Sequence, residues 1–560
     1  MKKKLFWLQR TFLTFAVTII FTLSLNTSQF TPGVFAIEND INYFEISSQQ
    51  PISIENDEDF KKYDFSGNGS SSNPYLIKNL VIIGKTIAIS VKNTTKYFAI
   101  VDCRIRFCDI GIYIFNASKG TAVILNNSLS YIQDQNALGS VGQAIFVSES
   151  EGIKIENNEI IDSDIAIFLS QSPYSQIVNN IIKEKYGITV ISSIQTLIEN
   201  NSLTNCGLNI YGKTEIEEYN AYIIKNNFIN DKKLGYFVDL TDKVIDKGIY
   251  GQILLINCTN FAIENQVLTD TTTGITMYFC KNIEITNCYS YSNIFEGVAA
   301  YGSSDIYIHN SILEENGFGF TGCGIRLRET EDSLIEDNVM RYNKGDGGIL
   351  ASLTNNISIK NNVLSFNKGE GIALKTCNNT KIQGNICFGN GIDGLSLLAT
   401  NNSLIEKNYF VENAETGVFL FDSCYNSIIN NTIMNNYNYG IMLMDAIADN
   451  KVRCRDNIIY LNFFINNNVN GTSQAFDNGY NNKWYNETIK KGNYWSDNTK
   501  RKYEISGAAK SYDKFPIKTN LERVSFSNFI YLSIIICVVA KIKKNKELKK
   551  FHRIFFHWFK

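Results

Sequence analysis

The sequence predicts a solenoid of short parallel β-strands, and three observations support that prediction. In a chain of 560 residues, a Gly followed by an apolar-x-apolar segment recurs every 23 residues from residue 348 to residue 440. Apolar residues alternate with period two inside these segments, so one side of each segment is buried. Between Pro74 and Pro516 the only proline is Pro173. Coils of 22–24 residues with three strands each are typical of a right-handed parallel β-helix, in which like positions stack about 4.8 Å apart.

The first 36 residues predict a signal peptide for export. Three lysines and Arg10 precede an apolar run at residues 12–25, and small residues stand at Val34 and Ala36, the positions that a signal peptidase reads. An uncleaved N-terminal anchor is the alternative. The fold is therefore expected to begin after residue 36.

A second apolar stretch predicts a transmembrane helix at residues 524–542. Six lysines follow between Lys541 and Lys550. By the positive-inside rule, residues 543–560 form a basic cytoplasmic tail and the body lies outside the membrane. A helix buried within the protein is the alternative.

The charge distribution argues against nucleic acid as a partner. The formal net charge is −2, although the last twenty residues contribute +7 and residues 1–36 contribute +4. The body from residue 37 to residue 540 therefore carries −13. A body this acidic repels polyanions.

Asparagine recurs after a short strand in a second register. Asn tolerates the left-handed backbone of a corner, and stacked Asn amides can hydrogen-bond from coil to coil. We therefore predict a structural role for this Asn register. It comprises Asn158, Asn180, Asn201, Asn265, Asn287, Asn310, Asn338, Asn362, Asn385, Asn408 and Asn431.

Three further motifs resemble segments of NosD-type β-helix proteins. PISIENDEDF with the following SGNGSSSNPYLIKNLVI resembles their opening, and residues 232–265 resemble their inserted coil. GNYWSDN at residues 492–498 resembles their closing motif. The likeness covers roughly residues 51–520 and implies the pectin lyase-like fold, a group that includes carbohydrate-binding and sugar hydrolase domains.

The motifs and the repeats together predict the domain organisation. We expect an N-terminal cap at residues 37–80, β-helix repeats at 81–470 and a C-terminal cap at 471–523. The signal peptide precedes these domains, and the transmembrane helix and basic tail follow them.

The NosD resemblance implies a role in copper delivery, but the supply of ligands argues against it. Copper sites use clusters of His, Cys or Met. Residues 37–540 contain one histidine, His309. Of their methionines, Met442 and Met444 lie close to each other in the sequence. No metal site or cofactor is therefore expected, with Ca²⁺ as the one ion that paired carboxylates could hold.

Two of the twelve cysteines align in adjacent coils. Cys258 and Cys280 are 22 residues apart, which stacks their α-carbons about 4.8 Å apart, inside the range for a disulfide. Most other cysteines find no partner in their column. We expect them to be small buried residues at turns.

The sheet that begins at each repeat Gly predicts a ligand-binding face. Its outer positions hold aromatic rings near cations, which suits sugars because rings stack on C–H faces and guanidinium groups pair with carboxylates. The alternative is a solvated face with scattered apolar residues. The predicted binding residues are Tyr278, Tyr301, Arg326, Arg328, Lys375 and Phe421.

Acidic residues at the corner before the Gly are the candidates for catalysis. Glu370 and Asp393 fall in one column about 5 Å apart, and Asp346 lies nearby. Such a pair could act as in a glycosidase or hold Ca²⁺, although hydrated turn residues are the common alternative. The Asp-Pro-His-Glu motif of alginate epimerases is absent from the sequence.

The sequence therefore favours a non-catalytic, membrane-anchored cell-surface β-helix that binds glycans or surface proteins. A surface-tethered polysaccharide lyase, epimerase or hydrolase is the second hypothesis. A structural spacer and a NosD-like accessory protein for copper delivery complete the alternatives.

Overall fold

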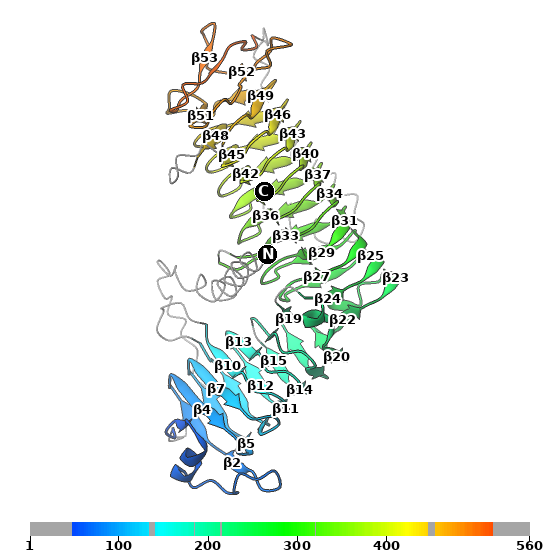
Figure 1. Cartoon of the computed structure of the whole chain (residues 1–560), viewed down its shortest axis with the longest axis vertical. Helices are drawn as coiled ribbons and strands as arrows, with labels where there is room; N and C mark the ends of the chain where they lie inside the picture. Colours follow the sequence, from blue (N-terminus) through cyan, green and yellow to red (C-terminus); the bar gives the residue numbers. More distant parts are fainter. Residues whose placement is uncertain are drawn as a thin grey trace, which may run out of the picture. The chain divides into compact units, whose positions relative to one another are not determined.

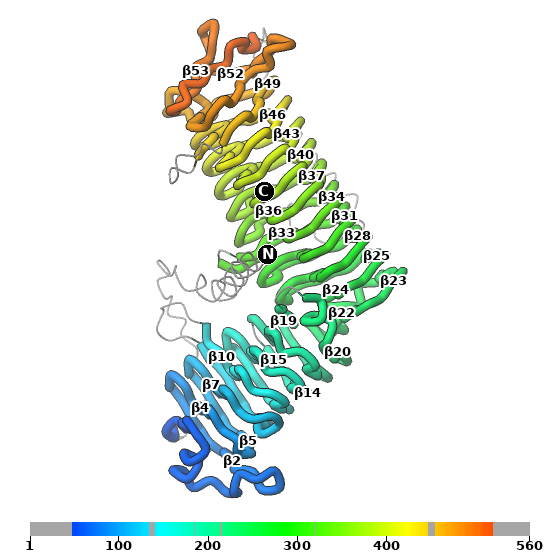
Figure 2. The backbone as a smooth tube through the Cα atoms, in the orientation of Figure 1, coloured from blue at the N-terminus to red at the C-terminus, as the bar shows by residue number. Residues whose placement is uncertain are grey.

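The computed structural model describes residues 48–518, except residues 134–140, 184, 213–214, 320 and 446–453. The chain divides into two units. The first unit extends to Val238 and includes Tyr250–Ile256 and Asp270–Thr273. The second comprises Asp239–Ile249, Asn257–Thr269 and the residues from Gly274 onward. Within each unit the backbone winds in successive coils, and the strands stack in register (Figures 1 and 2).

Three parallel stacks form the first unit, which we name sheets A, B and C. A short 3-10 helix, η1 (Asp57–Lys62), and α2 (Glu217–Asn220) are its described helices. Sheet A comprises β1 (Ile52–Ile54), β4 (Ile87–Thr94), β7 (Ile110–Ala117), β10 (Gln143–Ser148), β13 (Ile165–Ser170), β16 (Ile188–Ile191) and β19 (Leu208–Tyr211). Sheet B comprises β2 (Tyr75–Lys78), β5 (Phe98–Val101), β8 (Ala122–Leu125), β11 (Lys154–Glu156), β14 (Gln176–Val178), β17 (Leu197–Glu199) and β20 (Ile223–Lys225). Sheet C comprises β3 (Val81–Ile83), β6 (Arg104–Arg106), β9 (Ser128–Ser130), β12 (Glu159–Ile161), β15 (Ile181–Lys183), β18 (Ser202–Thr204) and β21 (Phe228–Ile229).

The predicted inserted coil is where the regular stacking changes. β22 (Lys232–Val238) turns back antiparallel to β21 and then pairs in parallel with β24 (Tyr250–Ile256). The intervening β23 (Thr241–Ile245) belongs to the second unit. The division between the units therefore runs through this segment.

Three parallel stacks also form the second unit, which we name sheets D, E and F. Sheet D comprises β27 (Ile275–Tyr278), β30 (Val298–Tyr301), β33 (Cys323–Arg328), β36 (Gly347–Ser352), β39 (Glu370–Lys375), β42 (Leu395–Leu398), β45 (Val418–Phe421), β48 (Ile441–Met444) and β51 (Ala475–Asp477). Sheet E comprises β23, β25 (Thr259–Glu264), β28 (Lys281–Thr286), β31 (Ser304–His309), β34 (Leu334–Glu336), β37 (Ser358–Lys360), β40 (Lys381–Gln383), β43 (Leu404–Glu406), β46 (Ser427–Ile429) and β49 (Ile458–Tyr460). Sheet F comprises β26 (Val267–Thr269), β29 (Tyr289–Tyr291), β32 (Ile312–Glu314), β35 (Val339–Arg341), β38 (Val363–Ser365), β41 (Ile386–Phe388), β44 (Tyr409–Val411), β47 (Thr432–Met434), β50 (Phe463–Ile465) and β52 (Tyr494–Trp495). The predicted right-handed parallel β-helix is thereby confirmed, with about 16 turns.

Asparagine ladders connect successive coils, as predicted. The two roles predicted for each Asn, forming the ladder and adopting the left-handed corner, fall on two neighbouring residues. The side chain of Asn408 donates to Asn431 Oδ1 at 2.9 Å and accepts from the amide of Asn385 at 2.9 Å. These ladder residues are fully buried. The left-handed backbone belongs to the residue before the ladder position, such as Asn430 with φ 56°.

This division of roles corrects the prediction for Asn265, Asn287 and Asn310. All three adopt the left-handed conformation, with φ values of 54°, 53° and 50°. The following residue takes the ladder position, because Cys288 N donates to Ser311 Oγ at 3.1 Å. The spacing of asparagines alone therefore does not separate corner positions from ladder positions.

Several cysteines occupy ladder positions, as expected for small buried residues. Cys103 N donates to Asn127 Oδ1 at 3.0 Å, and Cys377 N donates to Thr400 Oγ1 at 3.3 Å. Burial raises the pKa of the Cys103 thiol to about 11, which keeps it protonated at neutral pH. These thiols therefore replace Asn, Ser or Thr in a packing role.

The C-terminal end of the second unit is closed by buried aspartates that accept indole hydrogen bonds. Trp495 Nε1 donates to Asp513 Oδ2 at 2.9 Å, and Trp484 Nε1 donates to Asp477 Oδ2 at 3.0 Å. The short strands β53 (Tyr503–Glu504) and β54 (Tyr512–Asp513) pair antiparallel here. The GNYWSDN motif thus places Trp495 over the last coil.

In the part of the chain that the structure describes, no helix is long and apolar enough to cross a membrane. The signal peptide predicted for residues 1–36 and the transmembrane helix predicted for residues 524–542 both lie outside the described residues.

Candidate functional site

The strand register of sheet D places five of the six predicted ligand-binding residues in one outer column. Tyr278 pairs with Tyr301, and Tyr301 pairs with Arg328. Through Ser352 of β36 the column then continues to Lys375. It passes Leu398 of β42 and reaches Phe421 of β45. Rings and cations are therefore separated by whole strand steps of about 4.8 Å.

The two tyrosines form a stacked pair. Their ring centroids lie 5.2 Å apart with an interplanar angle of 18°. Tyr278 is 5% exposed, whereas Tyr301 is half-buried. Tyr278 therefore supports the Tyr301 ring from below, and Tyr301 is the ring of the pair that a ligand can reach.

Arg326 lies in the neighbouring outer column and is held between two carboxylates. Its Nε lies 2.6 Å from Glu296 Oε1, and its Nη2 lies 2.8 Å from Asp346 Oδ2. The Arg326 side chain is 15% exposed. The guanidinium is thus engaged within the protein, and it neutralises the predicted catalytic candidate Asp346.

The other two cations of the face, Arg328 and Lys375, lie in the same outer column as Tyr301. Arg328 Nε lies 3.4 Å from Glu329 Oε1, and the Arg328 side chain is 22% exposed. Lys375 is half-buried two strands further along sheet D.

Glu370 and Asp393 occupy a desolvated position at the corner before each repeat Gly. Burial raises the pKa of Glu370, and the Lys375 ammonium opposes this shift. Burial also raises the pKa of Asp393 to about 7, helped by the nearby Glu370 carboxylate and opposed by the Thr416 amide. That amide donates to Asp393 Oδ1 at 2.9 Å. At neutral pH the Asp393 carboxyl is therefore partly protonated.

Phe421 lies two strands beyond Lys375 in the same column, beside a second ring on its own strand. The Phe419 and Phe421 ring centroids are 6.4 Å apart. Met442 and Met444 follow on β48, paired in register with these two rings. The column thus ends in an apolar segment.

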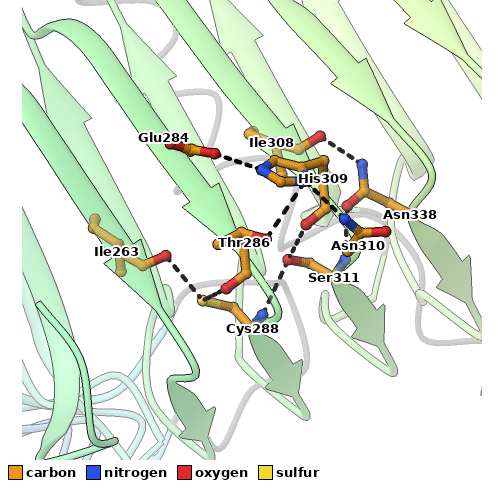
Figure 3. A network of polar contacts seen from close by, with 9 residues as sticks. All are labelled: Ile263, Glu284, Thr286, Cys288, Ile308, His309, Asn310, Ser311 and Asn338. Atoms are coloured by element: carbon orange, nitrogen blue, oxygen red, sulfur yellow. Dashed lines mark hydrogen bonds and ion pairs between the residues drawn. The ribbon is translucent and has the colours of Figure 1, made fainter. Parts of the chain in front are cut away.

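His309 is part of a separate polar network on sheet E (Figure 3). Its Nε2 lies 2.8 Å from Glu284 Oε1, and Asn310 Nδ2 lies 2.8 Å from its Nδ1. The imidazole stacks on the Tyr307 ring at 4.1 Å. An amide donor at Nδ1 leaves the proton of a neutral ring on Nε2, which donates to Glu284. His309 is thus bound within the protein, away from the sheet D column.

Cys258 and Cys280 lie in adjacent coils as predicted, and the structure does not join them in a disulfide. The pKa of the Cys280 thiol is raised by burial and by its hydrogen bond with Cys258. The contact between the thiols is therefore present, and the disulfide itself stays a prediction.

A second aromatic column, which the sequence analysis did not identify, lies on the outer face of sheet A. The Tyr113 and Phe146 rings stack at 5.0 Å, and Phe168 meets Phe146 edge-on at 5.3 Å. The Lys92 ammonium lies 5.8 Å from the Tyr113 centroid. The period-two placement of these rings in three successive coils was the signal that could have revealed them.

A family model described as "Periplasmic copper-binding protein (NosD)" matches residues 121–240, 238–385 and 324–500. These matches together span more than half of the chain. The chain belongs to the NosD family. The resemblance inferred from the opening, inserted-coil and closing motifs is thereby confirmed.

Comparisons with other proteins add little to the NosD assignment. No curated protein matches the chain. The periplasmic alginate epimerase AlgG is 12% identical, with 78% of this chain and 84% of that chain covered and a TM-score of 0.29. The Azotobacter vinelandii mannuronan C-5 epimerase AlgE4 A-module is 14% identical, with 67% and 94% covered and a TM-score of 0.29. PfbA, a surface adhesin of Streptococcus pneumoniae, is 14% identical, with 64% and 85% covered and a TM-score of 0.24. Similarities this low say nothing about the activity of the chain.

The copper in the NosD description can be tested against the donors of this chain. Among the described residues, no group of three His, Cys, Asp or Glu side chains is placed to hold a metal ion. His309 is bonded to Glu284 and Asn310, and the described thiols are buried except for the half-buried Cys424. The described part of this NosD-family chain thus does not fit a copper centre built from these donors.

Proposed function

We propose that this NosD-family chain is an extracytoplasmic protein that binds a polysaccharide along the outer face of sheet D. The observation that supports this proposal is the in-register column from Tyr301 to Phe421, which holds a ring at each end and two cations between them. The predicted export signal and the periplasmic description of the family support the location. We propose in addition that residues 524–542 anchor the chain in a membrane, as their apolar composition and the lysines after them predict.

The spacing of the column suits an extended ligand. Tyr301 and Arg328 are one strand apart, and Lys375 lies two strands further. Three strand steps amount to roughly 14 Å, which brings one ring and two cations within reach of two or three sugar units. The Tyr301 ring would stack on a sugar face, while Arg328 and Lys375 would pair with carboxylates or hydroxyls.

The ion pairs of Arg326 reduce the number of cations that can recognise a ligand. Because Glu296 and Asp346 already neutralise its guanidinium, Arg326 contributes to the order of the face rather than to binding. Selection of an acidic polysaccharide would then depend on Arg328 and Lys375. The acidic body as a whole would oppose long-range attraction, so binding would depend on close contact.

A polysaccharide lyase, epimerase or hydrolase is the second candidate, and the Asp393 carboxyl favours it. A carboxyl with a pKa of about 7 can donate a proton at neutral pH, as a general acid does. Glu370 lies one coil away, close enough that its carboxylate raises the pKa of Asp393, and such paired carboxyl groups are what glycosidases use. Catalysis in this case requires that the ligand on the column reach the corner residues.

The test is a polysaccharide array and an activity screen on the mature chain, residues 37–560. The proposal expects retention of an acidic polysaccharide with no change in its length or stereochemistry, measured by mass spectrometry and nuclear magnetic resonance. Products that disappear in Asp393→Asn would support the enzyme instead. No retention of any polysaccharide, combined with stoichiometric copper binding in a titration, would overturn both proposals.

A further inference from the structure

The outer face of sheet A in the first unit carries two columns of uncharged side chains from β7 to β19. The strand register defines them, because Phe146 of β10 pairs with Tyr113 of β7 and with Phe168 of β13. The alternate residues Ile145 and Val147 are fully buried in the core. One column, which we call the ring column, comprises Tyr113, Phe146, Phe168, Thr189 and Asn209. The other comprises Phe115, Ser148, Ser170, Ile191 and Tyr211.

The ring column begins with three aromatic side chains in consecutive strands. The ring centroids of Tyr113 and Phe146 are 5.0 Å apart with an interplanar angle of 23°, and Phe168 meets Phe146 edge-on. The Phe115 ring lies 6.3 Å from the Tyr113 ring. Tyr113, Phe115 and Phe146 are half-buried, and Phe168 is 7% exposed. The rings therefore give this face a strip of aromatic surface, with two serines of the other column beside it.

The ion pair next to these columns adds no net charge to the face. Lys92 of β4 pairs in register with Phe115, and its Nζ lies 3.2 Å from Glu55 Oε1. The outer column of sheet D, by contrast, carries Arg328 and Lys375. Aromatic rings with neutral hydroxyls suit the C–H groups and hydroxyls of an uncharged sugar, whereas carboxylates are best bound by cations.

Ser90 adds a buried hydroxyl at the start of the ring column. It pairs in register with Tyr113, so its side chain lies on the outer side of sheet A. Ser90 is 4% exposed, and within the described part of the chain its Oγ has no hydrogen-bond partner. A buried hydroxyl without a partner lowers the stability of the fold, and a ligand hydroxyl would supply that partner.

We propose that the outer face of sheet A binds an uncharged polysaccharide, whose sugar units contact Tyr113 and Phe146 and whose hydroxyl pairs with Ser90. The Lys92 side chain, which is 28% exposed, moves aside to admit the ligand at Ser90. Three strand steps from β4 to β13 amount to roughly 14 Å, the length of two or three sugar units. This site belongs to the first unit and is separate from the sheet D column. A chain with both sites would bind a neutral and an acidic polysaccharide.

The measurement is isothermal titration of the mature chain, residues 37–560, with soluble uncharged polysaccharides of glucose, mannose and galactose. We expect at least one of them to bind, with an affinity that is nearly the same at low and high salt, because salt screens charged interactions. Polygalacturonate, an acidic polysaccharide, is titrated in parallel as the probe for the sheet D column. The two proposals can therefore fail separately.

Two variants assign the binding to sheet A. Ser90→Ala should weaken it by about twofold to tenfold while leaving the thermal midpoint unchanged or higher, because the unpaired hydroxyl is removed. Phe146→Ala should weaken it by about tenfold. Phe107→Ala removes a ring that is 44% exposed at a corner of the same unit, and it is the matched control. Phe107→Ala and Arg328→Ala should both bind the uncharged polysaccharide as the wild-type chain does.

Three results would overturn the proposal. One is that none of the uncharged polysaccharides binds. Another is that the folded Ser90→Ala and Phe146→Ala variants bind with full affinity, and the third is that Phe107→Ala weakens binding as much as they do. Circular dichroism identifies which variants fold. If Phe146→Ala does not fold, the smaller change Ser90→Ala decides the outcome.

Discussion

At the scale of single residues, the buried Asp393 makes the stability of the fold depend on pH. Its pKa is raised to about 7 by burial, so ionisation destabilises the folded state. The stability that the protonated Asp393 contributes is fully present below its pKa of about 4 in the unfolded chain. It is lost as the pH rises through its folded-state pKa of about 7. Asp393→Asn keeps an acceptor for the Thr416 amide, and we expect it to raise the free energy of unfolding at pH 8.

The expected gain from Asp393→Asn is on the order of 4 kcal/mol at pH 8, because three pKa units correspond to about that free energy. Near pH 4 the gain should vanish. Chemical denaturation at both pH values measures it, with Glu331→Gln at an exposed carboxylate as the control. Equal stabilisation at both pH values would show that the charge of Asp393 is not the cause.

Arg326 should be needed for stability rather than for ligand affinity. Arg326→Met would remove the guanidinium that pairs with Glu296 and Asp346, and Glu296 is 6% exposed. We expect a loss of about 3–5 kcal/mol in the free energy of unfolding, measured by denaturation. Adding Glu296→Gln should recover part of that loss. If Arg326→Met has the same free energy of unfolding as the wild-type chain, the claim that these ion pairs stabilise the fold is wrong.

The sequence could predict the outer columns but not these ion pairs. Period-two alternation assigns Tyr301, Arg328 and Lys375 to one face without any knowledge of the turns. The partners of Arg326 lie 30 residues before it and 20 residues after it, in turns of irregular length. Alternation does not specify how such turns fold back over a strand.

At the scale of elements, the asparagine ladders hold neighbouring coils together. The Asn408 amide donates to Ile382 O, Glu406 O and Asn431 Oδ1 at 2.9–3.0 Å. Asn408→Ala would leave the buried amide of Asn385 without its acceptor. We expect a loss of about 2–4 kcal/mol in the free energy of unfolding, since several buried polar groups lose partners.

Thermal or chemical unfolding measures the effect of Asn408→Ala, and Asn355→Ala at an exposed position is the matched control. A similar small loss from both variants would contradict the role of the ladder. The sequence predicted the ladder because Asn recurs, but the corner residues Asn265, Asn287 and Asn310 share that spacing. Only the place of each Asn relative to the end of its strand distinguishes a corner position from a ladder position.

At the scale of the whole molecule, the negative charge of the body and its buried carboxylates both make the folded state less stable as the pH rises. The body carries −13, and burial raises the pKa of Glu370, Asp393 and Asp513. All three contribute stability that is lost as pH rises. We therefore expect the thermal midpoint of the mature chain to be higher at pH 5.5 than at pH 8 by several degrees. A midpoint that rises between these pH values would contradict this prediction.

The repeats made the β-helix predictable over most of its length, because each coil repeats the same pattern. The division into two units was not predictable, since residues 232–265 contribute strands to both. The transmembrane helix predicted for residues 524–542 stays a prediction, because it lies outside the described residues. Apolarity alone does not distinguish a bilayer from a sheet face.

The central claim is that the outer column of sheet D binds a polysaccharide, and titration of the Arg328→Ala chain with the polysaccharide retained on the array tests it most directly. Arg328 points away from the core, so folding should be unchanged. Lys381→Ala, on sheet E, is the control. We predict that Arg328→Ala weakens binding by about 1.5–3 kcal/mol, the range for a charged hydrogen bond, while Lys381→Ala has no effect. Equal losses from both variants, or full affinity in Arg328→Ala, would contradict the claim.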